Sequence, residues 1–342
     1  MNRVHPKGRS RAGTSSSPRR WLVALVAVAL LALVVDSAAI GTSTAKTHKR
    51  HHHQKRHRLP DKFFGINPNA RIPTAGEFKR MKRGGGDSYR APVYWVTIEG
   101  ASPGTFNWTS VDTTVENAAA ARVDVLPFIW GSPDWLGCKN PVPGSGCVGA
   151  LPVETPAQVQ AWKSFLTAAV ARYGPHGQFW REHPLLPKQP IRSWEIWNEE
   201  NYFYFVDPIS PENYARLLKI SRSALKSADR GSKVIMGGLF GEPFEKYPQG
   251  IYANVFLRRL YEVPGVKPSF DAVGLHPYAR DVTSLKRQIL GFRSVMKGAG
   301  DGATPIWLDE FGWSSRPPSD AALARGIRGQ QRQLVAAYKM LI

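Results

Sequence analysis

The chain has 342 residues, 42% of them hydrophobic, which suits one large domain or two ordinary ones and argues against disorder throughout. Its formal net charge is +20, but residues 1–60 hold twelve Lys or Arg and a single acid, Asp36, and therefore carry +11 of that charge. The remainder is only moderately basic and shows no nucleic-acid recognition motif, so the charge does not indicate a nucleic-acid-binding protein.

The first forty residues have the pattern of an export signal. A basic segment, residues 1–20, precedes an apolar run of fifteen residues from Trp21 to Val35, and small residues follow up to position 40. Such a pattern predicts a cleaved signal and a destination outside the cell or in the cell envelope. The alternative is an uncleaved membrane anchor through residues 21–40, because that segment is just long enough to span a bilayer.

Residues 41–60 form a basic, histidine-rich tract of low complexity. A segment of this composition cannot bury apolar surface, so it predicts a disordered linker between the signal and the rest of the chain. The histidines in this tract could bind a metal ion, but its composition favours a charged tether. The domain that carries any fold then spans residues 61–342.

Two cysteines, Cys138 and Cys147, flank a loop rich in proline, glycine and serine. In an exported chain this spacing predicts one local disulfide. A zinc site would need two more ligands nearby, and the sequence offers none; a catalytic Cys–His pair is the less favoured reading.

From residue 61 onward, short apolar runs alternate with amphipathic stretches. The expected strands lie within residues 62–67, 89–98, 123–131, 191–199, 233–240, 270–278 and 305–313. The expected helices lie within residues 155–174, 210–231, 282–300 and 321–342. Strands that alternate with helices, without hairpin signals, predict βαβ units and a parallel sheet.

Two α/β architectures compete for this pattern, a doubly wound open sheet and a (β/α)8 TIM-type barrel. The open nucleotide-binding sheet predicts a glycine-rich turn after the first strand, and the segment after residues 62–67 has none. Acids and aromatics at the ends of several strands favour the barrel. Only seven strands are found, so strand 8 and helix 8 are missing, and the prediction is a C-terminally truncated barrel or one left open between strands one and seven, poorly stable in isolation.

The segment "RSWEIWNEEN", residues 192–201, places several acids at the end of the fourth strand. Alternation along a strand puts Glu195, Trp197 and Glu199 on one face, with Glu199 at the mouth of the barrel. Glu195 then lies deeper, as a buried charge that needs a partner. In "PIWLDEFGW" the seventh strand ends at Asp309 and Glu310, and alternation does not decide between these two.

These two segments resemble the strand-four and strand-seven motifs of clan A glycoside hydrolases. Within that clan, the overall residue pattern most resembles families 39 and 5. The resemblance covers residues 62–342 and implies that Glu199 is the acid/base and Glu310 the nucleophile of a retaining enzyme. Glu200 stands where the clan usually has proline, which we expect to shape the loop without affecting the chemistry.

The same resemblance implies supporting residues on other strands. "SYRAPVYW" gives Arg90 as the residue that orients the nucleophile, "GLHPY" gives His276 and Tyr278 as supports, and Asn198 is implied to bind the sugar 2-hydroxyl. The implied partner is a poly- or oligosaccharide substrate, bound by a monomer that needs neither metal nor organic cofactor. The alternative is a catalytically inactive barrel that binds glycans at the cell surface.

Sugar rings present apolar C–H faces, so a glycosidase needs exposed aromatic side chains beside its polar groups. Aromatic residues at or just after strand ends are the candidates, and the sequence predicts substrate contacts for Trp95, Trp135 and Trp313.

Overall fold

The computed structural model describes residues 59–60, 62–67, 71–138, 146–243, 249–317 and 323–342. The chain divides into two units, residues 1–56 and 57–342, and all described residues belong to the second. The predicted signal or anchor at residues 1–40 and most of the predicted linker at 41–60 therefore lie outside the described residues. None of the helices in the described part has the length and apolar character needed to cross a membrane.

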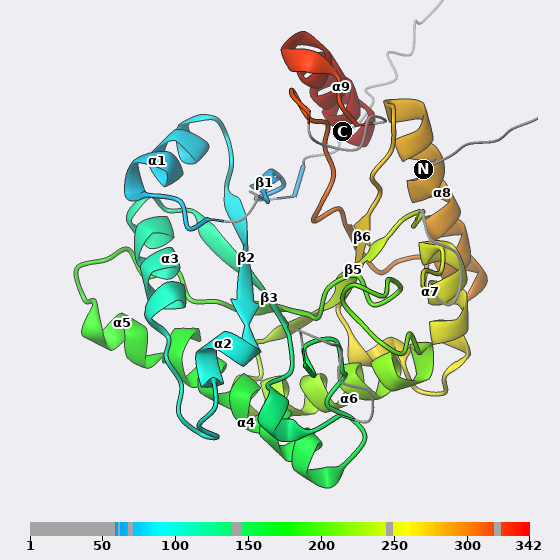
Figure 1. Cartoon of the computed structure of the whole chain (residues 1–342). Helices are drawn as coiled ribbons and strands as arrows, with labels where there is room; N and C mark the ends of the chain where they lie inside the picture. The colour runs from blue at the N-terminus through cyan, green and yellow to red at the C-terminus, as the bar shows by residue number, and fades with distance from the viewer. Residues whose placement is uncertain (1–58, 61, 68–70, 139–145, 244–248, 318–322) are drawn as a thin grey trace, which may run out of the picture. The chain divides into compact units, whose positions relative to one another are not determined.

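The second unit is built on one curled parallel sheet of seven strands in chain order (Figure 1). The strands are β1 Gly65–Ile66, β2 Ser88–Tyr94, β3 Asp124–Trp130, β4 Ser193–Ile196, β5 Lys233–Phe240, β6 Ala272–His276 and β7 Ile306–Trp307. Six strands fall within segments predicted from the sequence, β2 begins one residue before its predicted segment 89–98, and each neighbouring pair is parallel. Among the described residues, β1 pairs only with β2 and β7 only with β6, so these two short strands form the edges of the sheet.

Helices cover the outer face of this sheet (Figure 1). They are α1 Ala75–Arg83, α2 Trp95–Glu99, α3 Thr109–Ala120, α4 Pro156–Tyr173, α5 Gln178–Glu182, α6 Pro211–Ala228, α7 Ala253–Glu262, α8 Val282–Gly298 and α9 Gly326–Leu341, with two short 3-10 turns, η1 Asp134–Leu136 and η2 Lys267–Ser269. The capping signals explain why the predicted helices begin where they do. Thr155 accepts a hydrogen bond from the backbone N–H of Gln158 with Pro156 in the first position, and Ser210 caps α6 in the same way.

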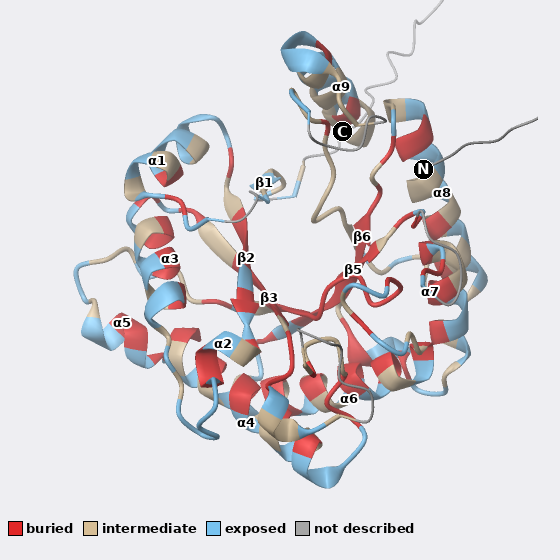
Figure 2. Ribbon diagram, in the orientation of Figure 1, coloured by how far each residue is buried: buried red, intermediate tan, exposed pale blue. Residues whose placement is uncertain are grey.

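The main core lies between the sheet and these helices (Figure 2). Its largest side chains include Trp162, Trp194, Trp197 and Tyr214, none of which is more than 1% exposed. The indole N–H of Trp162 donates to Ser221 Oγ at 2.8 Å, which satisfies the one polar atom that this ring buries. Trp194 and Ile196 of β4 pack in this core, which holds the strand in place just before the turn that follows it.

Aromatic contacts connect α9 to the residues beside both edge strands. The ring of Tyr338 in α9 lies 5.1 Å from that of Phe64, which immediately precedes β1, and 5.6 Å from that of Phe311, which lies beyond β7. The two edges of the sheet are therefore joined through a helix side chain rather than through backbone pairing in the part of the chain that the structure describes.

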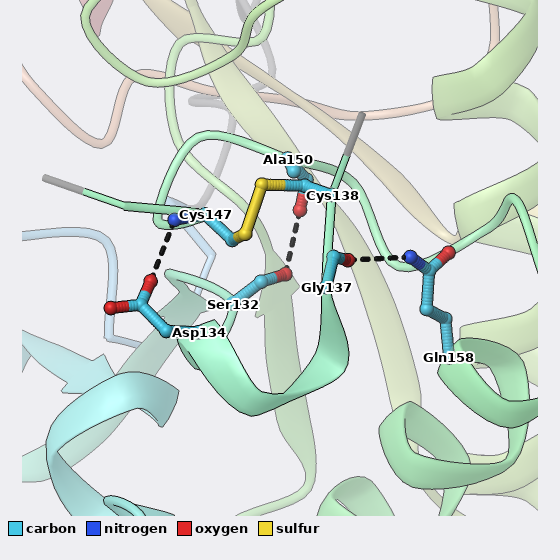
Figure 3. The surroundings of a disulfide bond; sticks show 7 residues. All are labelled: Ser132, Asp134, Gly137, Cys138, Cys147, Ala150 and Gln158. Carbon is cyan, nitrogen blue, oxygen red and sulfur yellow. Dashed lines mark hydrogen bonds between the residues drawn. A yellow bond between two sulfur atoms is a disulfide. The ribbon is translucent and has the colours of Figure 1, made fainter. Parts of the chain in front are cut away.

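The predicted disulfide between Cys138 and Cys147 is confirmed and lies in the loop after β3 (Figure 3). Hydrogen bonds on both sides hold that loop: Asp134 Oδ1 accepts from the backbone N–H of Cys147 at 2.7 Å, and Gln158 Nε2 donates to the carbonyl of Gly137 at 2.9 Å.

Removing this disulfide is expected to destabilise the protein. A sequence separation of 9 residues closes a short loop, and cross-linking a loop of this length stabilises by about 2–3 kcal/mol through the unfolded chain. Replacing both Cys138 and Cys147 with serine should lower the free energy of unfolding in urea by that amount. Alkylation of the unreduced protein followed by mass spectrometry should label no thiol, and labelling of both cysteines would contradict the assignment.

Candidate active site

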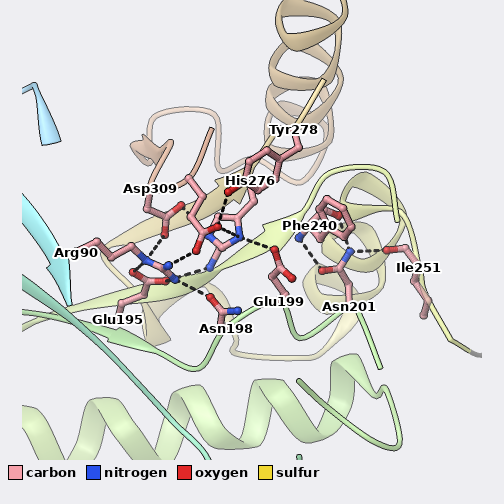
Figure 4. A network of polar contacts seen from close by, with 12 residues as sticks. Arg90, Glu195, Asn198, Glu199, Asn201, Phe240, Ile251, His276, Tyr278 and Asp309 are labelled. Carbon is pink, nitrogen blue, oxygen red and sulfur yellow. Dashed lines mark hydrogen bonds and ion pairs between the residues drawn. The ribbon is translucent and has the colours of Figure 1, made fainter. Parts of the chain in front are cut away.

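The polar residues predicted to form the site converge at the carboxyl edge of the sheet (Figure 4). Arg90 lies within β2, Glu199 follows β4, His276 ends β6, Tyr278 follows it, and Glu310 comes shortly after β7. Because the strands are parallel, their carboxyl ends lie at the same edge of the sheet, and side chains far apart in the sequence meet there.

Arg90 holds the centre of this cluster and is only 3% exposed. Its Nε and Nη2 atoms donate to the two carboxylate oxygens of Glu195 at 2.8 and 2.6 Å, and Nη2 also donates to Asn198 Oδ1 at 2.7 Å. Its Nη1 donates to Glu310 Oε1, so one guanidinium binds both carboxylates. Arg90 is thus the partner that the buried charge of Glu195 requires.

Glu310 is surrounded by groups that favour its ionised form. Tyr278 donates its hydroxyl proton to Glu310 Oε2 at 2.8 Å, and Arg90 binds the other oxygen. Burial alone would raise the pKa of Glu310, but the charges of His276 and Arg90 and the Tyr278 hydrogen bond together lower it below the ordinary value. Burial and the nearby Glu310 carboxylate raise the pKa of Tyr278, which therefore keeps its proton and remains a donor.

His276 lies between the two candidate catalytic carboxyl groups and is fully buried. Its Nδ1 is 2.9 Å from Glu199 Oε1 and 3.8 Å from Glu310 Oε2. Burial opposes protonation of the ring, yet the carboxylates of Glu310 and Asp309 raise the pKa of His276 well above its usual range. An imidazolium in this place holds both carboxyl groups at one edge of the site.

The carboxyl groups of Glu199 and Glu310 approach each other closely. One carboxylate oxygen of each lies, together with a ring nitrogen of His276, in a group whose atoms are all within 4.8 Å of one another. A second such group joins Glu195, His276 and Asp309. Both groups contain His276, so its two ring nitrogens connect the two sets of carboxyl groups.

The sequence suggested that regular strand alternation places Glu199 at the site, but the backbone departs from that alternation before it reaches Glu199. The strand β4 ends at Ile196, and the next turn contains two residues with left-handed backbone, Trp197 with φ 72° and Glu199 with φ 44°. The Trp197 N–H donates to the carbonyl of Ile129 at 2.8 Å and the Glu199 N–H to that of Gly238 at 3.2 Å, so neighbouring strands hold the turn. Such backbone conformations persist only where the surroundings enforce them.

Two supporting residues were not assigned a role from the sequence. The side chain of Asp309 is 1% exposed, with Oδ1 3.5 Å from His276 Nε2 and Oδ2 3.8 Å from Arg90 Nε. Asn201 is fully buried; its Oδ1 accepts from the N–H of Phe240 at 2.8 Å and its Nδ2 donates to the Phe240 carbonyl at 2.7 Å, which joins the β4 turn to the end of β5. The signal for both was available, since each is a polar residue within two positions of a predicted catalytic glutamate.

Glu200 does more than shape the loop. Its side chain is fully buried, and neither carboxyl oxygen has a hydrogen-bond partner among the described residues. A Cβ at Gly237 would lie 1.9 Å from Glu200 Oε1, so β5 admits this carboxyl group only because residue 237 is glycine. The Tyr214 hydroxyl lies beside it but donates to the Ile196 carbonyl at 2.8 Å, and burial raises the pKa of Glu200 to about 8.

A cleft of about 520 Å³ opens beside Glu199. Its lining residues are Glu199, Tyr202, Phe240, Glu242, Tyr278, Ala279, Arg280, Ser284, Arg287, Gln288 and Leu323. Three aromatic side chains form one wall: the ring of Phe240 lies 5.3 Å from that of Tyr202 and 6.1 Å from that of Tyr278. Aromatic and polar groups in one concave surface are typical of small-molecule sites.

The tryptophans predicted to contact substrate do not line this cleft. Trp95 begins α2, is fully buried and donates its indole N–H to Glu99. Trp313 is 5% exposed and packs in a cluster with Ala279, among others. Burial therefore leaves Trp95 and Trp313 almost no surface for a sugar ring. Trp135 is partly exposed in η1, with its ring 6.4 Å from that of Trp95.

Comparison with known proteins shows the same fold in glycoside hydrolases. Similar solved structures include a family 39 glycoside hydrolase from Bacteroides cellulosilyticus (TM-score 0.55, 16% identity, 81% of this chain and 53% of that one). A monomeric β-xylosidase from Caulobacter crescentus (TM-score 0.55, 15% identity, 75% and 54%) and a GH39 enzyme from Xanthomonas axonopodis pv. citri (TM-score 0.51, 14% identity, 75% and 53%) are also similar.

These likenesses establish the shared fold at low sequence identity. The chain spans about half the length of each of these three structures. Family 39 is one of the two families that the sequence motifs resemble. No protein-family model matches the sequence, and no curated protein matches it.

Proposed function

We propose that this protein is a retaining glycoside hydrolase that cleaves O-glycosidic bonds in a poly- or oligosaccharide. The observation that carries the proposal is the close approach of the Glu199 and Glu310 carboxyl groups, with one oxygen of each within 4.8 Å. Retaining enzymes hold their two carboxyl groups about 5–5.5 Å apart, whereas inverting enzymes separate them by about 6.5–9.5 Å to admit a water molecule. The likeness in fold to family 39 enzymes supports the same assignment.

The first step of the proposed reaction assigns a different role to each glutamate. Glu310, kept ionised by Arg90 and His276, attacks the anomeric carbon and forms a glycosyl ester as the glycosidic C–O bond breaks. Glu199 gives its proton to the departing glycosidic oxygen, so the leaving group departs as an alcohol. Because the Tyr278 hydroxyl and Arg90 each bind one Glu310 oxygen, the carboxylate is held in a fixed orientation for attack.

The second step reverses these roles with water. Glu199, now ionised, takes a proton from water, the hydroxide attacks the anomeric carbon, and the bond to Glu310 breaks. Asn198 accepts from Arg90 through its Oδ1, which leaves its amide N–H group to donate to the sugar 2-hydroxyl. Two inversions at one carbon give net retention.

We further propose that the enzyme acts as a monomer. We also propose that it works outside the cell or in its envelope, because residues 1–40 have the pattern of an export signal.

Azide rescue of an acid/base variant tests the role of Glu199. With an aryl glycoside selected from a chromogenic panel, Glu199→Ala should hydrolyse slowly because water lacks its general base. Azide needs no base, so it should raise turnover by roughly tenfold or more and yield a glycosyl azide of retained anomeric configuration, as NMR would show.

The matched control is Glu262→Ala, which removes an exposed glutamate on α7. It should behave as the wild type with and without azide. A product of inverted configuration would contradict the retaining mechanism. A wild-type protein that binds glycans but hydrolyses none would support the alternative of an inactive glycan-binding barrel.

A further inference from the structure

The cleft extends from Glu199, the proposed acid/base, toward a wall that carries positive charge. Beyond Glu199 and Tyr278, its lining continues along the loop after β6 and the first turns of α8, where it includes Arg280 and Arg287. These two guanidinium groups lie in the same concave surface as the proposed acid/base.

Neither arginine is neutralised by a close, buried partner. Arg280 is 73% exposed and its Nε lies 3.4 Å from Asp281 Oδ2. Arg287 forms no hydrogen bond or ion pair among the described residues, although its charge, like that of Arg280, helps to lower the pKa of Asp281. Asp281 is already engaged as the N-cap of α8, where its Oδ1 accepts from the Ser284 N–H at 2.8 Å. The acids that line the cleft itself are Glu199 and Glu242.

A third cation reinforces the same rim. The guanidinium of Arg325 donates to the carbonyl oxygen of Arg280 from Nε at 3.1 Å and from Nη2 at 2.6 Å. Arg280 and Arg287 thus line one end of the cleft, and Arg325, which does not line it, adds a third positive charge beside the Arg280 backbone. Guanidinium groups bind carboxylates and sulfates well because their paired N–H donors match two acceptor oxygens.

We propose that this end of the cleft binds a negatively charged group on the glycan, a carboxylate or a sulfate ester, on a unit or substituent outside the sugar held between Glu199 and Glu310. The proposal rests on the proposed function and adds a substrate class to it, the acidic glycans. Arg287 makes the main contact, because it lines the cleft and forms no hydrogen bond or ion pair with another described side chain.

Binding in a catalytically blocked background provides the test. The Glu310→Gln protein is titrated onto immobilised tetrasaccharides, and its affinity for each is measured. The tetrasaccharides come in matched sets that share one backbone: a neutral member, one oxidised to the carboxylate at C6, and one sulfated at O6. We expect a charged member to bind about tenfold more tightly than its neutral counterpart, and the advantage to shrink as salt is raised. The carboxylate and sulfate arms distinguish the two sources of charge.

A second substitution identifies the residue responsible. Adding Arg287→Gln should remove most of that advantage, roughly a five- to tenfold loss for the charged glycan, and leave binding of the neutral one unchanged. Adding Arg258→Gln, an exposed arginine on α7 away from the cleft, should change neither.

Three results would overturn the inference: neutral glycans that bind as well as charged ones, a charged-glycan advantage that survives Arg287→Gln, or no binding to any set. Wild-type hydrolysis of neutral glycans without preference for charge would overturn this inference and leave the proposed function in place. Binding of charged glycans that the wild type fails to hydrolyse would support the inference and contradict the proposed function.

Discussion

Substituting Glu310 with glutamine is expected to abolish turnover. An amide cannot form the glycosyl ester, and Glu310 is the carboxylate whose ionisation Arg90 and His276 favour. Loss of a covalent nucleophile typically lowers kcat by at least about a thousandfold. Steady-state hydrolysis of the best aryl glycoside, with a burst-phase measurement for the wild type, checks the result.

The fold of the variant must be verified, because glutamine also alters a buried hydrogen-bond network. Glutamine still accepts from the Tyr278 hydroxyl, so the urea midpoint should change little compared with the change in activity. Glu262→Gln, on the exposed face of α7, is the matched control and should keep full activity. A Glu310→Gln enzyme within tenfold of the wild type would exclude residue 310 as nucleophile.

Substituting Glu200 with glutamine is expected to stabilise the protein, by an amount that depends on pH. Burial raises the pKa of Glu200 to about 8 in the folded chain, above its ordinary value of 4.5. Between these values the folded state binds more protons at this position than the unfolded state, so this group lowers stability as pH rises from 4.5 to 8. At 1.36 kcal/mol per pKa unit, the cost at pH 7 is about 3 kcal/mol as an upper limit.

Urea unfolding at pH 4.5, 7 and 9 measures this contribution. Glutamine removes the titration, so the variant should match the wild type at pH 4.5 and exceed its stability progressively at pH 7 and 9. Glu195 and His276 also face this carboxyl group electrostatically, but both remain in the variant. Glu262→Gln should shift none of the midpoints, and a stability difference that is constant with pH would contradict a buried, protonated Glu200.

The sequence predicts the strands of this fold better than its helices. All seven strands lie in segments where apolar, β-branched and aromatic residues cluster, because a sheet covered by helices buries such runs. The helices α4 and α6 were predicted because Thr155 and Ser210, each followed by proline, mark their starts. Helices α3 and α7 lack a side-chain cap at their first turn, and packing in the folded unit rather than a local signal determines them.

The sequence predicts single residues of the candidate site, but it does not predict features that depend on an irregular backbone or on several distant segments. Parity along β4 correctly placed Glu195 as a buried charge, and Arg90 is its partner. The same parity argument was wrong for Glu199, because left-handed backbone at residues 197 and 199 interrupts the strand and no local residue preference marks it. The aromatic lining, which comes from Tyr202, Phe240 and Tyr278, depends on three separate strand ends and has no signature in any one segment.

The ring contacts of Tyr338 with Phe64 and Phe311, here called the joint between the two edge strands, affect how the folded unit opens. Phe64 and Tyr338 are 274 positions apart in the chain, so their contact depends on closing almost the whole unit into a loop. We expect this contact to form late in folding, because other contacts must first offset the entropy lost in that closure. The joint consists of a few ring contacts beside two-residue strands, so it belongs to the least protected part of the unit. Glu310 follows three residues after β7, so the proposed nucleophile is carried by that part. Local opening at these contacts would therefore release the Glu310 carboxylate while the turn that carries Glu199, bonded to β3 and β5, stays in place. If Glu310 is the nucleophile, as proposed, inactivation would precede global unfolding.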